Sequence, residues 1–339
     1  MANNFQPNDN FNYFLYWICE RMNIFWRRYA GQEFPWTEDP AFQGFKFTNV
    51  YRYLDRVSQY LLKEVIYNGK EYSKEDMFFR ILLFKHFNND LTWDELLKEF
   101  GDITYETGWE NIACFCDKKM DEDFRLYSNA YISGAWMFSK PRYSYIKGLS
   151  RHRGHFILFE EKFFQSGLVQ DMLQSKSFQE LFQFFRERDM FGDFLAQQYV
   201  IDMNYSPLFN FSENEFVVTG PGSIRGIDFT FEGAGNKKFD YVGAIKWVHD
   251  NFEELMGEFC RQTGMVWNPL PWEPVPSLIN LQNCFCETSK LAKRLGHVFR
   301  ENRKERMKTA YHPRNTEISF VFSPDWNVKM PDVNKLIID

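Results

Sequence analysis

Apolar residues recur at intervals of three and four along most of this chain, which is the spacing of one buried face of an α-helix. In residues 11–30 this stripe runs from Phe11 to Tyr29, and Gly31 follows as a stop signal. The same criteria predict helices over 48–66, 121–138, 160–165, 177–188, 193–203, 241–263 and 277–295. Ser73 and Thr92 each begin a sequence typical of a capping box, so we expect helices to start there as well.

Strand-like alternation is not sustained anywhere, and no internal repeat is found, so the predicted fold class is all-α. Residues 101–123, broken by glycine and acidic residues, and the proline-rich residues 268–276 are expected to be irregular. With 339 residues and 44% hydrophobic content, the chain can form one large domain or two lobes. We predict one helical domain over 1–296, followed by a basic C-terminal tail over 297–339.

The charge is uneven, although the net charge is only −6. Residues 290–314 hold nine Lys or Arg and two Glu, and residues 140–155 hold five Lys or Arg and no acid. Basic segments on an acidic body suit a partner that contacts one face of the protein. A solvated helix face is the alternative interpretation.

Aromatic residues make up 19% of the chain, with 38 Phe. A helical core packed with phenylalanine is the simpler explanation, and stacking platforms for nucleic-acid bases are the functional one. The six cysteines include two Cys-Phe-Cys triplets, which lack the two-residue gap of common zinc knuckles, so we expect no metal and reduced thiols in a cytosolic protein. The polar start predicts no signal peptide, and no apolar run reaches membrane-spanning length.

A glycine-rich stretch at 216–227 contains Gly220, Gly222 and Gly226 within seven residues, together with Pro221. We interpret it as a tight, hairpin-like turn that feeds a helix N-terminus, where free N–H groups can bind an anion such as phosphate. A purely structural turn is the alternative. Just upstream, Asp202 is a carboxylate inside an otherwise apolar helical run.

Arg52, Asp55 and Arg56 fall at i, i+3 and i+4 of the helix predicted over 48–66, so they are expected to share one face. They could form an exposed ion-pair ladder, which contributes little stability. They could instead form a phosphate clamp in which the aspartate orients the arginines.

Several common catalytic motifs are absent from the sequence. There is no phosphate-binding Gly-x-x-x-x-Gly-Lys-Ser/Thr loop, no dinucleotide Gly-x-Gly-x-x-Gly, no Gly-x-Ser-x-Gly elbow and no His-Glu-x-x-His. The zinc-deaminase signature is absent too. No cofactor is therefore indicated.

Five stretches in the same order resemble one known family. They are residues 27–56 (with Phe-Pro-Trp-Thr-Glu-Asp-Pro and Phe-Thr-Asn-Val-Tyr-Arg-Tyr-Leu-Asp-Arg), 127–131, 198–206, 216–227 and 281–290. Together they resemble the 5-hydroxymethyluracil DNA kinase helical-domain family. Its members include the proposed α-glutamyl/putrescinyl-thymine pyrophosphorylases, also described as amino-acid or polyamine DNA transferases. The resemblance spans roughly residues 11–294.

This resemblance implies a two-lobed helical fold related to helix-hairpin-helix DNA glycosylases, and a role in thymine hypermodification, mostly in phages. A kinase activates the hydroxymethyl group as a phosphate ester, and a transferase lets an amine displace phosphate or pyrophosphate. Because this chain has no kinase loop, the resemblance places it with the transferases. The implied partners are DNA with the activated base, a small amine and a separate kinase, with no membrane, in the host cytoplasm if the protein is phage-encoded.

The resemblance also suggests roles for individual residues, since a base must leave the duplex to be modified. Gly220, Gly222, Arg225 and Gly226 would hold DNA phosphate, and Arg52 and Arg56, with Asp55, would bind the anionic leaving group. Asp202, or else Glu287 one turn from Lys290, would accept the proton of the amine. Asn49 would read the Watson–Crick edge of the uracil. Two alternatives remain: a glycosylase in which Asp202 activates water, and a non-catalytic DNA-binding partner of a kinase.

Overall fold

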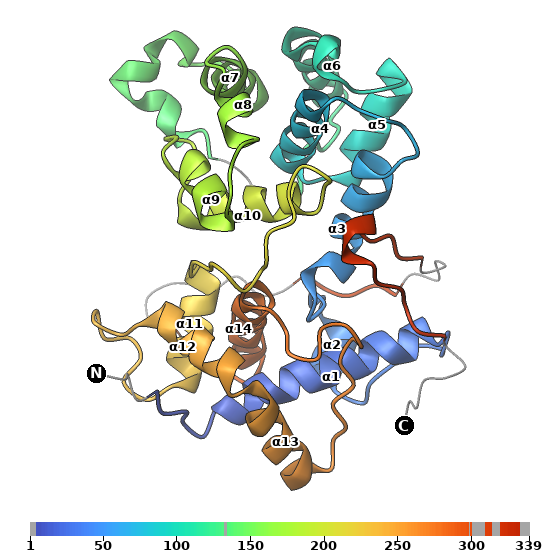
Figure 1. Cartoon of the computed structure of the whole chain (residues 1–339), viewed down its shortest axis with the longest axis vertical. Coiled ribbons are helices and arrows are strands. Elements are labelled where there is room, and N and C mark those ends of the chain that lie inside the picture. Colours follow the sequence, from blue (N-terminus) through green and yellow to red (C-terminus); the bar gives the residue numbers. More distant parts are fainter. Residues whose placement is uncertain (1–4, 132–133, 298, 300–308, 314–318, 333–339) are drawn as a thin grey trace. The chain divides into compact units, whose positions relative to one another are not determined.

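The computed structural model describes residues 5–131, 134–297, 299, 309–313 and 319–332 (Figure 1). Helices dominate these residues, and the only β-type pairings among them are three isolated bridges. The all-α prediction is therefore confirmed. Within this part of the chain, no helix has both the length and the apolar character needed to cross a membrane.

The chain divides into two compact units. The first contains the described residues of Met1–Asp55, Phe216–Phe320 and Val328–Asp339, and the second contains Arg56–Glu215 and Val321–Asn327. The helices of the first unit are α1 Phe11–Tyr29, α2 Pro40–Gly44, η1 Arg52–Leu54, α11 Pro221–Thr230, α12 Tyr241–Asp250, α13 Phe252–Thr263 and α14 Leu278–Arg294.

The core of the first unit forms around α14, which packs against α1, α11 and α12 (Figure 1). Ser277 caps this helix by accepting a hydrogen bond from the Asn280 backbone N–H at 3.3 Å. The ring of Phe285 stacks on that of Phe14 from α1, with 4.0 Å between centroids. Each of these two long helices buries an apolar stripe against the other. Such a stripe is visible in the sequence as regular apolar spacing, so periodicity alone predicted both helices.

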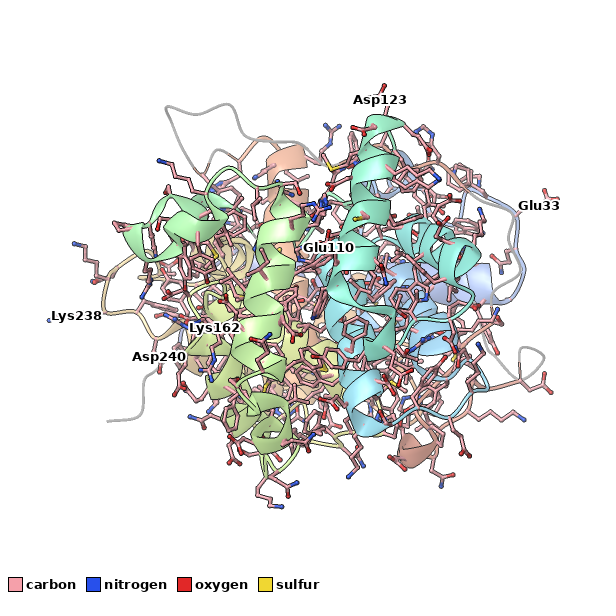
Figure 2. The ribbon with its side chains drawn as sticks, turned by 90° about the horizontal axis from the view of Figure 1, so that it is seen from above. Glu33, Glu110, Asp123, Lys162, Lys238 and Asp240 are labelled. Atoms are coloured by element: carbon pink, nitrogen blue, oxygen red, sulfur yellow. The ribbon has the colours of Figure 1, made fainter. Side chains whose placement is uncertain are left out.

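The second unit contains α3 Arg56–Tyr60, η2 Leu61–Ile66, α4 Lys74–Phe87, α5 Asp90–Phe100, η3 Tyr105–Thr107, α6 Trp109–Asp121, η4 Trp136–Ser139, η5 Pro141–Ile146, α7 Arg151–Phe159, η6 Glu160–Phe164, α8 Leu168–Met172, α9 Phe178–Arg186, α10 Asp193–Asn204 and η7 Pro324–Trp326. The elements η2 and η6 are π-helical. Every residue of α4 from Met77 to Phe87 is buried, which identifies α4 as the central helix. Charged groups cover the outside, for example the exposed Glu110 of α6 and Lys162 of η6 (Figure 2).

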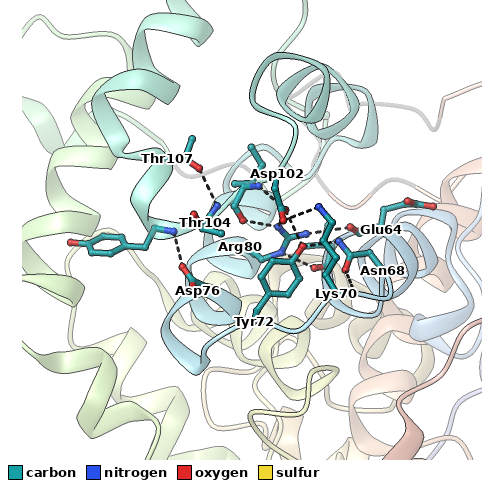
Figure 3. Close-up of polar contacts among 12 residues, drawn as sticks. Glu64, Asn68, Lys70, Tyr72, Asp76, Arg80, Asp102, Thr104 and Thr107 are labelled. Atoms are coloured by element: carbon teal, nitrogen blue, oxygen red, sulfur yellow. Dashed lines mark hydrogen bonds and ion pairs between the residues drawn. The ribbon is translucent and has the colours of Figure 1, made fainter.

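A buried arginine joins α4 to two neighbouring segments (Figure 3). Arg80 donates to the carbonyl oxygens of Val65 at 2.9 Å and Ile103 at 2.6 Å, and to Asp102 Oδ1 at 2.9 Å. Its guanidinium carbon lies 4.0 Å from the centre of the Tyr72 ring. Arg80 thus satisfies carbonyl groups at the end of η2 and before η3, and its role is to hold the fold together.

Several local predictions were wrong for identifiable reasons. Residues 109–121 form α6 although glycine and acids surround them, because Gly108 lies just before the helix rather than inside it. The helix predicted over 121–138 is not formed, and Asp123 and Tyr131 there adopt positive φ values of 57° and 59°. Thr92 does not cap a helix; it lies within α5 and donates to the Leu126 carbonyl at 2.6 Å.

About half of the predicted basic tail over 297–339 lies outside the described residues. The parts that are described pack against their own units. Phe320 contacts the rings of Phe25 and Tyr29 in the first unit. In the second unit, Ser323 accepts a hydrogen bond from the Tyr67 hydroxyl at 2.9 Å.

Candidate functional site

The most unusual polar residue of the first unit is Arg21, which lies on α1. Its Nε donates to the Thr48 carbonyl at 2.8 Å, and its Nη2 donates to Asn49 Oδ1 at 2.5 Å. The third nitrogen, Nη1, is buried and has no hydrogen-bond partner among the described residues. Burial lowers the pKa of Arg21 to about 10, so the group is still a cation at neutral pH.

A carboxylate with an altered acidity lies beside this guanidinium. Asp55 Oδ1 accepts the backbone N–H of Asn49 at 2.7 Å. Burial raises the pKa of Asp55 to about 6, although the Asn49 N–H and the charges of Arg21 and Arg52 act in the opposite direction. A carboxyl group with this pKa can exchange a proton near neutral pH.

Helix α14 supplies the other side of the site. Glu287 is fully buried; its Oε2 accepts the Thr48 backbone N–H at 3.2 Å, and its Oε1 accepts a hydrogen bond from Lys290 Nζ. One turn earlier, Asn283 donates to Thr48 Oγ1 at 3.0 Å. These bonds fix the segment that follows Thr48 between α1 and α14.

We call this group the charge cluster; it consists of Arg21, Asn49, Arg52, Asp55, Glu287 and Lys290. Five of its members were singled out from the sequence, and the fold brings them together from segments more than 200 positions apart. Within the described ranges, no three His, Cys, Asp or Glu side chains are grouped as a metal site requires. The cluster can hold an anion beside a proton acceptor.

The predicted clamp on one helix face is wrong in its geometry. Arg52 lies in the short helix η1, and its backbone N–H donates to Asn280 Oδ1 at 2.9 Å. Asp55 is extended (φ −68°, ψ 144°), which ends η1. Arg56 begins α3 in the second unit and pairs with Asp90. Thr48 caps no helix, because its backbone N–H and carbonyl bond to Glu287 and Arg21 instead.

Both the oxygen and the nitrogen of the Asn49 side-chain amide are already hydrogen-bonded. Its Oδ1 accepts from Arg21, and its Nδ2 donates to the Leu54 carbonyl at 2.8 Å. Reading a uracil edge would require the exchange of these bonds, so that role stays a prediction.

Asp202 lies in the second unit, on α10. Its Oδ2 is 2.7 Å from Lys85 Nζ, and the two side chains are 4% and 1% exposed. Lys85 Nζ also lies 4.6 Å from the centre of the Tyr131 ring. Asp202 is thus an anion held by a buried cation, and its role as a base stays a prediction.

The glycine-rich stretch leads into a helix N-terminus, as predicted, but the tight turn expected across 216–227 is wrong: Gly220 caps α11, and Pro221 to Thr230 are helical. Gly222 and Gly226 lie inside this helix, where α14 fills the space that a side chain would need. The Gly220 N–H is already bonded to Ser223 Oγ at 3.0 Å. Arg225 follows on the same helix, and its buried Nε has no hydrogen-bond partner among the described residues. DNA binding by these four residues stays a prediction.

Sequence reasoning missed Arg21, although a signal was present. It falls four residues after Trp17 and four before Phe25, both of which are buried on the inner face of α1. A cation at a position where the period predicts an apolar residue indicates a specific partner or function.

The raised pKa of Asp55 predicts a pH effect on stability. Folded Asp55 binds a proton more tightly than the unfolded chain does, so its contribution to the free energy of unfolding falls as pH rises from about 4 to about 6. We expect Asp55→Asn to become more stable relative to wild type by up to about 3 kcal/mol over this window, less where solvent screens the group. Urea unfolding at a series of pH values measures it.

The matched control is Asp123→Asn, which removes an exposed carboxylate just after α6 (Figure 2). Its stability relative to wild type should not follow the same pH profile. If the free energies of unfolding of Asp55→Asn and wild type differ by a constant amount from pH 4 to 7, the raised pKa assigned to Asp55 is contradicted.

Comparison with known proteins agrees with the helical character of the chain. The class is that of helical domains described for a DNA kinase. Residues 8–299 match the family described as "5-hmdU DNA kinase, helical domain", and the chain belongs to that family. No solved structure matches the chain significantly.

One curated relative is the "5-hmdU DNA kinase" of Bacillus phage SP10. It is 26% identical over 258 residues, which cover 73% of this chain. The match covers only 40% of the relative, so most of that kinase has no counterpart in the alignment.

Proposed function

We propose that this protein modifies 5-hydroxymethyluracil in DNA after the hydroxymethyl group has been activated by phosphorylation. An amine, either an amino acid or a polyamine, would displace phosphate or pyrophosphate from the base. The family match and the kinase relative support the hydroxymethyluracil substrate. The observation that carries the transfer step is Arg21 Nη1, a buried cationic donor that has no acceptor among the residues that the structure describes.

In the proposed reaction, the amine nitrogen forms a bond to the exocyclic methylene carbon as the carbon–oxygen bond to the phosphate breaks. The leaving oxygen keeps the bonding electrons, and negative charge develops on it. Arg21 and Arg52 stabilise that charge because they are positive groups in a site shielded from water. Lys290 adds a third positive charge beside Glu287.

The attacking amine must be neutral and must then lose a proton. Asp55 suits this step because its pKa of about 6 leaves it ionised at neutral pH and makes it more basic than an ordinary carboxylate. Glu287 is the second acceptor within the same cluster. Asp202 remains a separate candidate, since it lies in the other unit.

DNA must present the base outside the duplex. In this proposal, the start of α11 binds the DNA backbone through the Gly222 amide and through Arg225. A relation to helix-hairpin-helix DNA glycosylases belongs to the same proposal. A separate kinase supplies the activated base.

The test uses DNA that carries the phosphorylated or pyrophosphorylated hydroxymethyl base, a panel of amines and mass spectrometry of the nucleosides. Wild type should give an amine-substituted thymine, whereas release of free base would indicate a glycosylase. Arg21→Met should lower the rate of product formation about 100-fold or more, the cost of removing one charge-stabilising donor. Unchanged nucleosides with every amine would contradict the proposal.

Two controls separate chemistry from folding. Arg261→Met removes an exposed arginine of the same unit that pairs with Glu258, and it should keep wild-type rates. Arg21→Lys keeps the charge but loses the planar fork, so it should retain part of the activity. Pyrophosphate binding, measured by calorimetry below the unfolding temperature, should be lost in Arg21→Met and kept in Arg261→Met.

A further inference from the structure

The segment between α6 and α7 presents an exposed tryptophan. Trp136, the first residue of η4, is 67% exposed, and Tyr145 in η5 is 53% exposed. Large aromatic side chains normally bury most of their surface. These two rings are therefore exceptions to the phenylalanine-rich packing of the second unit.

The exposed rings are held by a well-anchored segment. Met137 and Phe138, directly after Trp136, are buried, as is Ile146 directly after Tyr145. A Cβ on Gly154 of α7 would lie 2.4 Å from the Phe138 ring, so this glycine is what lets the ring pack on α7. The scaffold fixes the inward residues and leaves Trp136 facing solvent.

Two lysines, Lys140 and Lys147, occur in the same segment as these rings. Lys140 Nζ lies 4.7 Å from the centre of the Trp136 ring. Lys147 is exposed, and neither lysine forms an ion pair within the described part of the chain. No acidic residue occurs between positions 136 and 149.

Two acids from neighbouring elements face the same segment. Asp189 pairs with Arg142 and accepts a hydrogen bond from the Tyr143 hydroxyl at 2.6 Å. Glu161 accepts one from the Tyr145 hydroxyl at 2.6 Å. Arg142 is thus neutralised, while Lys140 and Lys147 keep their positive charge for an external partner.

We propose that the Trp136 surface, made of Trp136, Lys140, Tyr145 and Lys147, binds unpaired DNA. A base stacks on the exposed indole, and the lysines contact phosphates on either side. This pairing of rings and cations is the chemistry that holds single strands without reading their sequence. A closed duplex offers phosphates but no free base face. The inference rests on the proposed function only in taking DNA as the partner.

The test is fluorescence anisotropy with a labelled single-stranded oligonucleotide that carries no modified base. Trp136→Ala should weaken binding about 5- to 150-fold, the loss expected when one stacking contact is removed. An abasic strand of the same length keeps the phosphates, so wild type and variant should bind it equally. Leu91→Ala, which removes another exposed apolar side chain of the same unit, should bind like wild type.

The charge is tested separately. Lys140→Gln should reduce the slope of log affinity against log salt by about 0.7, the value for one phosphate contact on a single strand. Lys63→Gln, an exposed lysine on η2, is the matched control and should leave the slope unchanged. Trp136→Ala should also leave the slope unchanged, because it removes stacking and not charge.

Equal single-strand affinity in wild type and Trp136→Ala would overturn the proposal, as would an equal loss on the abasic strand. Loss of binding to anionic lipid vesicles with unchanged oligonucleotide binding would assign the surface to membranes instead. None of these assays needs the activated base or the amine. If no transferase product forms but stacking is confirmed, the proposed function fails and this inference stands.

Discussion

Gly226→Ala is expected to destabilise the protein by about 3 kcal/mol or more, the upper range for overpacking a well-filled core. A Cβ at this position would lie 2.0 Å from the Phe285 carbonyl oxygen and 2.6 Å from its carbonyl carbon. These are backbone atoms of α14, which cannot rotate away as a side chain can. Relief therefore requires α11 and α14 to separate. Urea unfolding followed by circular dichroism measures the loss.

Two other glycines of the first unit allow the effect of an added Cβ on stability to be compared. Gly222→Ala would meet Cys286 Sγ at 2.3 Å, so adding Cys286→Ala should restore part of the stability. Gly44→Ala meets no atom within 4 Å and should be close to wild type. A Gly226→Ala variant as stable as Gly44→Ala would show that the two helices are not packed as described.

The same contact explains why the glycine-rich stretch was misinterpreted from sequence. Three glycines and a proline within seven residues are typical of a turn, and the resemblance added DNA contact. The spacing of four between Gly222 and Gly226 also places both on one face of a helix. Only the partner helix, some 60 positions later in the chain, decides between these possibilities.

Helices with a strong local sequence pattern were predicted well, whereas segments held by polar contacts to distant parts of the chain were not. Helices α1, α9, α10 and α14 have recognisable ends or a clear apolar stripe, so their own sequences largely determine them. The segment over 48–66 has helical spacing too. Its first part instead bonds to Arg21 and Glu287, which local reasoning cannot anticipate.

In the candidate site, too, some features could be predicted from the local sequence and others depend on distant contacts. The sequence pattern and the resemblance supplied Asn49, Arg52, Asp55, Glu287 and Lys290, and the fold places all five in one unit. The expected arrangement of Arg52, Asp55 and Arg56 on one helix face was wrong, because Asp55 breaks the helix between the two arginines. Arg21 could have been found only by asking why a cation lies on the apolar face of the first helix.

Lys85→Met is expected to destabilise the protein by about 3–5 kcal/mol, because it leaves the Asp202 carboxylate buried without its cation. The double variant Lys85→Met/Asp202→Leu removes both charges and should recover most of that loss. Lys70→Met is the matched control: its partner Asp102 is 2.9 Å away, close to the 2.7 Å between Lys85 and Asp202, but Lys70 is 53% exposed (Figure 3). This control should cost much less stability than Lys85→Met, because solvent screens an exposed ion pair.

The same set of variants tests whether Asp202 does more than balance a charge. Asp202→Asn keeps the shape of the side chain but removes its basicity, so a catalytic Asp202 predicts loss of product with DNA binding retained. Lys85→Met keeps the carboxylate, and it should retain turnover when assayed well below its unfolding temperature. If Asp202→Asn turns over normally once folded, the base must be sought in the charge cluster, and Asp55→Asn becomes the decisive variant.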